Sequence, residues 1–124
     1  MFCTHVYFNG NCREAIDLYK KAFNANILTI IKNTESGKED QVIHAEIEIH
    51  QQKLMMNDFG NNQGAATPNG YQLVVKFDQV NQLEQAFSEF VENCTILFPM
   101  QPTDYSPCVV QFIDGFGTRW AFMV

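Results

Sequence analysis

The segment F-N-G-N-C-R-E-A-I-D-L-Y-K-K-A-F, residues 8–23, decides how the fold begins. It follows an apolar stretch, residues 2–8, that predicts a strand ending at an Asn-Gly turn. Asn11 with Glu14 three residues later has the spacing of a helix capping box. The sequence therefore predicts a strand that leads into a helix ending near residues 24–26. Its apolar face recurs every three or four residues: Ala15, Ile16, Tyr19, Ala22 and Phe23.

Three further strands are expected next. Residues 27–32 are mainly apolar, and a polar loop separates them from V-I-H-A-E-I-E-I-H at residues 42–50. This stretch alternates apolar and polar side chains, as in a strand with one buried face. Residues 53–58 form one more predicted strand after a turn at residues 51–52. The alternation places Ile43, Ala45, Ile47 and Ile49 on the buried face and His44, Glu46, Glu48 and His50 on the other.

The same order of elements recurs after residues 59–70, a stretch rich in glycine and asparagine that is typical of a linker. A strand is predicted at 71–77, and Asn81 with Glu84 repeats the cap spacing before a second apolar helical stripe. Three prolines within 99–107 predict an irregular edge or a loop there. The stripe is Leu83, Ala86, Phe87, Phe90 and Val91, the last strands are 95–100, 108–113 and 119–124, and residues 114–117 form a hairpin turn.

Two similar modules are thus implied, residues 1–58 and 71–124, within one domain of 124 residues. Each has the order strand, helix and three strands, so the predicted class is α+β with two βαβββ modules. In each module, the helix covers one face of the half-sheet and leaves the other face for a different contact. Paired half-sheets would enclose a cleft.

The composition narrows the classes of function. Hydrophobic residues make up 46% and charged residues 18%, which is typical of a globular chain with one core. The net charge of −6 repels phosphate backbones and anionic lipids, so no nucleic acid and no membrane is expected as a partner. Four scattered cysteines without a C-x-x-C pair, and a start that does not resemble a secretory signal, predict reduced thiols and a cytoplasmic location.

Four blocks of sequence resemble one family. They are residues 8–23, V-I-H-A-E-I at 42–47, L-M-M-N-D at 54–58 and D-G-F-G-T-R-W at 114–120. Their order is similar to that in the PhnB-like branch of the glyoxalase, bleomycin-resistance and extradiol-dioxygenase superfamily. The resemblance implies two βαβββ modules around a U-shaped cleft, a divalent metal in many relatives, and a homodimer. Some relatives are labelled methyltransferases, but no glycine-rich S-adenosylmethionine loop follows a strand here.

The resemblance also implies where a metal would be held. In metal-binding relatives, the first and last strands of each module supply His, Glu or Gln ligands. Here the corresponding positions are Thr4 or Cys3, residues 55–57, Gln72 and Ala121. None of these is a carboxylate or an imidazole, so the sequence predicts no metal and no other cofactor.

A second group of polar residues is expected in the cleft. His5, Tyr7, His44 and Glu46 would share one wall, where a neutral histidine beside a carboxylate could act as a general base. On the other module Gln72, Lys76 and Arg119 would face the cleft, the last two as a pair for an anionic group. A solvated strand face is the alternative interpretation.

Two classes of function therefore stay open. One is a homodimeric protein that binds a small molecule without a metal. The other is an enzyme, either metal-free through His44 and Glu46 or a metal-dependent lyase, isomerase or dioxygenase.

Overall fold

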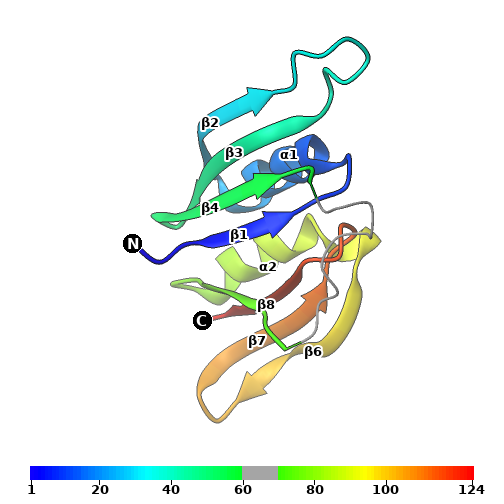
Figure 1. Ribbon diagram of the computed structural model, residues 1–124. Helices are drawn as coiled ribbons and strands as arrows, with labels where there is room; N and C mark the ends of the chain where they lie inside the picture. Colours follow the sequence, from blue (N-terminus) through cyan, green and yellow to red (C-terminus); the bar gives the residue numbers. More distant parts are fainter. Residues whose placement is uncertain (60–69) are drawn as a thin grey trace. The chain divides into compact units, whose positions relative to one another are not determined.

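The computed structural model describes residues 1–59 and 70–124 (Figure 1). It divides the chain into two compact units, Met1–Ala66 and Thr67–Val124. Across the described ranges the chain forms eight strands, two α-helices and one short 3₁₀ helix, which confirms the predicted α+β class with two βαβββ modules. All but the end residues of the expected linker, 59–70, lie outside the described residues, and the cleft between the modules stays a prediction.

The first unit contains one sheet and one helix. The sheet order is β1-β4-β3-β2, with β1 parallel to β4 and the other neighbours antiparallel. The helix α1 packs against β3, where Ala45 and Ile47 are fully buried together with Tyr19 of the helix. The elements are β1 (Thr4–Tyr7), α1 (Cys12–Phe23), β2 (Asn26–Lys32), β3 (Val42–Ile49) and β4 (Gln52–Asn57).

The start of α1 is held by a residue distant in sequence. Asn11 is the N-cap, as its spacing predicts, but its side chain does not cap the helix. The buried carboxylate of Asp58 does so instead, because its Oδ1 accepts the N–H groups of Gly10 at 2.8 Å and Cys12 at 2.9 Å. Its Oδ2 accepts the N–H of Val42 at 2.8 Å. One side chain therefore joins the end of β4, the start of α1 and the start of β3.

Two details of β3 correct the sequence prediction. The pairing of β2 with β3 shifts between Ile31 and Lys32, which partner His44 and Val42. The shift skips Ile43, so Val42 takes the buried position and Ile43 is exposed. A bulge of this kind breaks the strict alternation that the sequence suggested.

At its other end, β3 stops one residue earlier than expected. His50 and Gln51 both have positive φ angles, 47° and 67°, and form a two-residue hairpin between Ile49 and Gln52. Positive φ at both central residues is the geometry of a type I′ turn. His50 therefore belongs to the turn rather than to the polar face of the strand, and the turn lies at 50–51 instead of 51–52.

The second unit has the sheet order β5-β8-β7-β6, with β5 parallel to β8. The helix α2 packs against β8, over a cluster of aromatic rings that includes Phe90, Phe112, Trp120 and Phe122. The carboxylate of Asp114 accepts the indole N–H of Trp120 at 2.9 Å, and Trp120 is buried in the core. The elements are β5 (Leu73–Lys76), α2 (Val80–Ser88), η1 (Val91–Asn93), β6 (Thr95–Thr103), β7 (Ser106–Ile113) and β8 (Arg119–Met123).

The predicted cap of the second helix is wrong. The N-cap is Gln79, whose backbone N–H is accepted by Oε1 of Gln82 at 3.2 Å, so the helix begins before Asn81. The helix also ends at Ser88, earlier than the stripe suggested, and Val91 is exposed in the 3₁₀ turn. The Gln79–Gln82 pair has the reciprocal spacing of a capping box, with glutamine in place of the usual serine or threonine.

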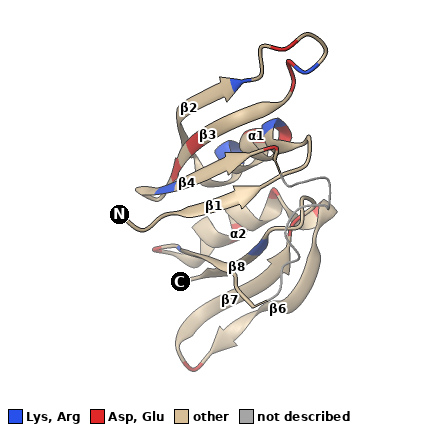
Figure 2. Cartoon of the chain, in the orientation of Figure 1, with Lys and Arg blue, Asp and Glu red and all other residues tan. Residues whose placement is uncertain are grey.

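Strand β6 includes two of the three prolines at residues 99–107. This stretch is therefore an irregular edge strand rather than a loop. Pro99 and Pro102 lie on the outer strand of the sheet, and the pairing with β7 shifts three times along it. A proline lacks the N–H that a central strand must donate, so an edge position is where it is tolerated. Neither β6 nor β7 carries a charged residue (Figure 2). No helix in the described ranges has the length and apolar character to cross a membrane.

We expect Asp58→Ala to lower the free energy of unfolding by at least about 3 kcal/mol, because three backbone N–H groups lose their acceptor at about 1–3 kcal/mol each. Urea unfolding followed by circular dichroism measures the change. The control is Asp17→Ala, which removes an exposed ion pair with Arg13 and should cost about 0.5 kcal/mol or less. Equal losses for the two variants would contradict the bridging role of Asp58.

Candidate ligand-binding face

The first sheet has one face covered by α1 and one face that α1 leaves uncovered, which we call the open face. Ala45, Ile47 and Met56 point toward the covered side and are fully buried. Because side chains alternate along a strand, the residues between them point the other way. The open face carries His5 and Tyr7 from β1, Lys53, Met55 and Asn57 from β4, and His44, Glu46 and Glu48 from β3.

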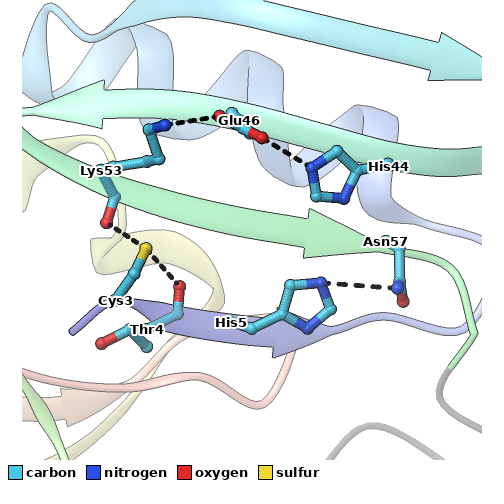
Figure 3. A network of polar contacts seen from close by, with 7 residues as sticks. All are labelled: Cys3, Thr4, His5, His44, Glu46, Lys53 and Asn57. Carbon is cyan, nitrogen blue, oxygen red and sulfur yellow. Dashed lines mark hydrogen bonds and ion pairs between the residues drawn. The ribbon is translucent and has the colours of Figure 1, made fainter. Parts of the chain in front are cut away.

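Three charged or ionisable side chains form a continuous chain on the open face (Figure 3). Nζ of Lys53 lies 2.8 Å from Oε1 of Glu46, and Nε2 of His44 lies 2.8 Å from Oε2 of the same carboxylate. The side chains of Lys53, Glu46 and His44 are 33%, 21% and 31% exposed. Both carboxylate oxygens of Glu46 therefore have a hydrogen-bond donor at short distance in a partly shielded environment.

These hydrogen bonds set the charge states of Glu46 and Lys53. The hydrogen bond from Lys53, and then that from His44, lower the pKa of Glu46 below its ordinary value of 4.5. The hydrogen bond to Glu46 in turn raises the pKa of Lys53 above 10.5. The pair is therefore ionised on both sides at neutral pH, and a carboxylate can only accept hydrogen bonds. It follows that Nε2 of His44 carries a proton.

A second group of contacts surrounds His5. Its ring lies edge-on to Tyr7, with ring centroids 4.8 Å apart, and nearly parallel to His44 at 6.3 Å. Nε2 of His5 lies 3.5 Å from Nδ2 of Asn57. Burial, and then the nearby His44, lower the pKa of His5 below 6.5, so this ring is neutral near pH 7. The structure thus brings together His5, Tyr7, His44 and Glu46, the four residues that the sequence placed on one wall.

Sequence reasoning missed two members of this group, Lys53 and Asn57. Both belong to β4, whose neighbours are β1 and β3, and the alternation of β4 could have placed them on one face. The pairing of Glu48 with Lys53 brings the ammonium beside Glu46, which no local spacing predicts. The Sγ of Cys3 donates to the carbonyl of Lys53 at 3.2 Å. Thr4 pairs with the buried Leu54 and therefore points to the covered side, so it is unsuited to the ligand position that the resemblance gave it.

The predicted residues of the second unit lie on one face of its sheet but not together. Lys76 pairs with Met123 at the far end of β8, whereas Arg119 begins that strand. Because β5 and β8 are parallel, four residues separate the two cations along the strands, about 13 Å. The register thus separates their backbones, and an anion-binding pair of Lys76 and Arg119 stays a prediction. Gln72 precedes Leu73, the partner of Trp120, and so lies beside Arg119 in the register.

The residues of the open face do not fit a divalent metal. In the part of the chain that the structure describes, no three His, Cys, Asp or Glu side chains lie close enough to hold one. Glu46 is the carboxylate nearest to the histidines, and the ammonium of Lys53 occupies one of its oxygens while His44 occupies the other. A cation bound there would have to displace an ammonium from a 2.8 Å contact.

The fold and the sequence define the family. The sequence profile of the glyoxalase/bleomycin resistance protein/dioxygenase superfamily matches residues 4–122. The chain belongs to this superfamily, which confirms the family predicted from its four sequence blocks. Its two four-stranded sheets with one helix each match the superfamily's pair of βαβββ modules.

Individual relatives agree with this assignment. Protein YjdN of Escherichia coli (strain K12) is 26% identical over 136 residues, covering 97% of this chain and 92% of YjdN. A PhnB protein from Bacillus cereus is 26% identical with a TM-score of 0.87, covering 98% of this chain and 97% of that one. FosX, a fosfomycin resistance protein from Listeria monocytogenes solved with Mn(II) and 1S,2S-dihydroxypropylphosphonic acid, shares the fold, with a TM-score of 0.73 at 7% identity and coverage of 99% and 90%.

The Lys53–Glu46 pair predicts a window of pH in which it stabilises the fold. Since the pKa of Glu46 is lowered from 4.5, its contribution is present above pH 4.5 and is lost as the pH falls through the folded-state value. Since the pKa of Lys53 is raised from 10.5, its contribution is present below pH 10.5 and is lost as the pH rises further. The difference in unfolding free energy between the wild type and Glu46→Gln should therefore be constant between these limits and shrink outside them.

Urea unfolding across the pH range measures this difference. Glu48→Gln is the matched control, because Glu48 lies on the same strand face and contacts Asn26 rather than a cation. A difference for Glu46→Gln that stays unchanged in acid would contradict the ionised pair.

Proposed function

We propose that this protein binds a small organic molecule on the open face of its first sheet, without a metal ion. The observation that carries the proposal is the series of hydrogen-bonded side chains Lys53–Glu46–His44 beside His5 and Tyr7. Polar groups of this kind, held in fixed positions on a sheet face that the helix leaves uncovered, are suited to orienting a ligand. The superfamily assignment supports a binding or catalytic role in general and does not choose the ligand.

The arrangement is better explained by binding than by a merely solvated strand face. Holding a lysine and a glutamate in one geometry costs side-chain entropy, and exposed ion pairs return about 0–1 kcal/mol of stability. Here two donors converge on one carboxylate, and all three side chains are about two-thirds or more shielded. Stability alone is a weak reason for such an arrangement. A site prepared in advance for a ligand is a stronger one.

The charges of the open face favour a metal-free site. Lys53 supplies beside Glu46 the positive charge that a divalent ion would supply in a metal-binding relative. A metal-dependent lyase, isomerase or dioxygenase is the alternative function. It requires Lys53 to leave Glu46.

We also propose that two copies of the chain associate. The outer strand β2 exposes Ile27, Leu28 and Ile31 along an edge that carries no proline, whereas the outer strand β6 has two. Exposed apolar edges are normally covered or blocked, since they template pairing with another strand. The four free thiols are consistent with the cytoplasmic location expected from the sequence.

Ligand binding is tested with a library of neutral, anionic and cationic aromatic fragments, followed by NMR of the labelled protein. We expect fragments that move the signals of His5, His44 and Tyr7. Because binding to the folded state stabilises it, a fragment at about ten times its Kd should add about 1.4 kcal/mol to the free energy of unfolding. The effect should be lost in His44→Ala.

Glu35→Gln is the matched control, since it alters an exposed ion pair with Lys38 in the loop before β3 and is not one of the residues of the open face. Fragments that shift other signals while those of β1, β3 and β4 stay still would place the site elsewhere and refute the proposal.

The metal-free assignment predicts that protein expressed with zinc, nickel, manganese and iron available carries no stoichiometric metal. Elemental analysis of the purified protein measures the content. A near-stoichiometric metal that disappears in His44→Ala would overturn this assignment and favour the metal-dependent enzyme.

Association of two copies predicts a mass in solution of about 28 kDa, twice that of the 14.2 kDa chain. Light scattering at micromolar concentrations measures it. Replacing Leu28 by Lys should then give the mass of one chain, because a charge on the edge of β2 blocks pairing. A wild-type mass of one chain would contradict the dimer.

A further inference from the structure

We propose that His5 and His44 are held in opposite tautomers, so that the open face presents one hydrogen-bond donor and one acceptor to a neutral ligand that carries the complementary pair. The inference rests on the proposed binding function and names the chemical class of its ligand. It follows from the partners of the two rings (Figure 3).

The tautomer of His44 is set by Glu46. The carboxylate has only lone pairs to offer, and it lies 2.8 Å from Nε2 of His44. A hydrogen bond therefore requires the proton on Nε2. In the neutral ring the other nitrogen, Nδ1, is then an acceptor.

The tautomer of His5 is set by Asn57, whose amide orientation is itself fixed. Oδ1 of Asn57 accepts the backbone N–H of Phe59 at 2.9 Å, so the NH₂ group is the end that faces Nε2 of His5. An NH₂ group can only donate. Nε2 of His5 is thus the acceptor, and the proton of the neutral ring lies on Nδ1.

Both Nδ1 atoms are available to a ligand. In the described parts of the chain, neither Nδ1 atom has a hydrogen-bond partner. Neither belongs to the fully buried side-chain atoms that lack a partner, so both can be reached from solvent. The rings are nearly parallel, with an angle of 11° and centroids 6.3 Å apart. The separation suits a ligand whose donor and acceptor lie on different atoms of one small molecule rather than on a single functional group.

The charges around the rings favour a ligand without net charge. Glu46 is already neutralised by Lys53 at 2.8 Å, and the lowered pKa of His5 keeps that ring neutral near pH 7. Glu48, the remaining acidic residue of the face on β3, lies four residues from His44, about 13 Å along the strand, and so does not face a ligand held between the two rings. An anion beside the rings would meet Glu46 as well as Lys53, and a cation would meet Lys53 as well as Glu46, so the ion pair attracts neither charge strongly.

Long-range proton–nitrogen NMR correlation spectra of the free protein test the tautomers directly. We expect the Nε2–H form for His44 and the Nδ1–H form for His5. In Glu46→Gln, Lys53 keeps the amide oxygen and the NH₂ group turns to His44, which should change that ring to Nδ1–H. In Asn57→Asp, the new carboxylate should change His5 to Nε2–H.

The same spectra provide the controls. Glu48→Gln should leave both rings unchanged, and the signals of His50 in the hairpin turn should stay still in every variant. Preserved signals from α1 and β2, in the same unit as the substituted residues, show that each variant is folded. The same tautomer in both rings of the wild type would overturn the inference.

The ligand class is tested with four matched probes: meta-hydroxyacetophenone, which is neutral with a donor and an acceptor, its methyl ether, meta-hydroxybenzoate as an anion, and tyramine as a cation. We expect the first to bind at the open face and its methyl ether to bind about tenfold more weakly, because the ether cannot donate to Nδ1 of His44. Binding of meta-hydroxyacetophenone should weaken similarly in Glu46→Gln.

The outcomes separate this inference from the proposed function. Binding of a charged probe at the open face, with no preference for the neutral donor–acceptor probe, would refute the inference and leave the binding function standing. If neither the probes nor any fragment of the library moves the signals of this face, both are refuted.

Discussion

The carboxylate of Asp58 is the interaction on which the first unit depends. It accepts three backbone N–H groups from two other segments, at the start of α1 and at the start of β3. Because Asp58 directly follows β4, these bonds fix where β4 ends relative to both neighbours. Its negative charge also lies at the positive end of the α1 dipole. Burial, and then this charge, raise the pKa of the Cys12 thiol to about 12, so Cys12 stays a protonated core residue.

The register that Asp58 holds decides which side chains share the open face. A shift of one residue in β4 would turn Lys53 and Asn57 toward α1 and bring Leu54 and Met56 to the surface. With the observed register, an ammonium, a carboxylate and two imidazoles lie on one side of three adjacent strands. The contacts among them satisfy Glu46 completely and leave one nitrogen of each ring for a ligand. The net charge of the whole chain, −6, therefore differs from the local charge that a ligand meets on the open face.

The sequence predicted local structure well and long-range contacts poorly. The alternation of β3 correctly placed His44 and Glu46 opposite the core, because side-chain direction along a strand is a local property. The bridging role of Asp58 could not be predicted from the sequence, since its partners lie 16 to 48 residues away. Lys53 was missed because its contact with Glu46 depends on the register in which β4 pairs with β3. The separation of Arg119 and Lys76 along their strands is set by the parallel pairing of β5 with β8, and neither strand alone contains that information.

The central claim is that Lys53, rather than a metal ion, neutralises Glu46 beside the two histidines. The most direct test is a crystal structure of the protein grown with manganese and nickel, with anomalous difference maps collected for both metals. The account predicts Nζ of Lys53 and Nε2 of His44 in hydrogen-bond contact with Glu46, and no anomalous peak at the open face. A peak bonded to His44 or Glu46, with the side chain of Lys53 turned away, would contradict it.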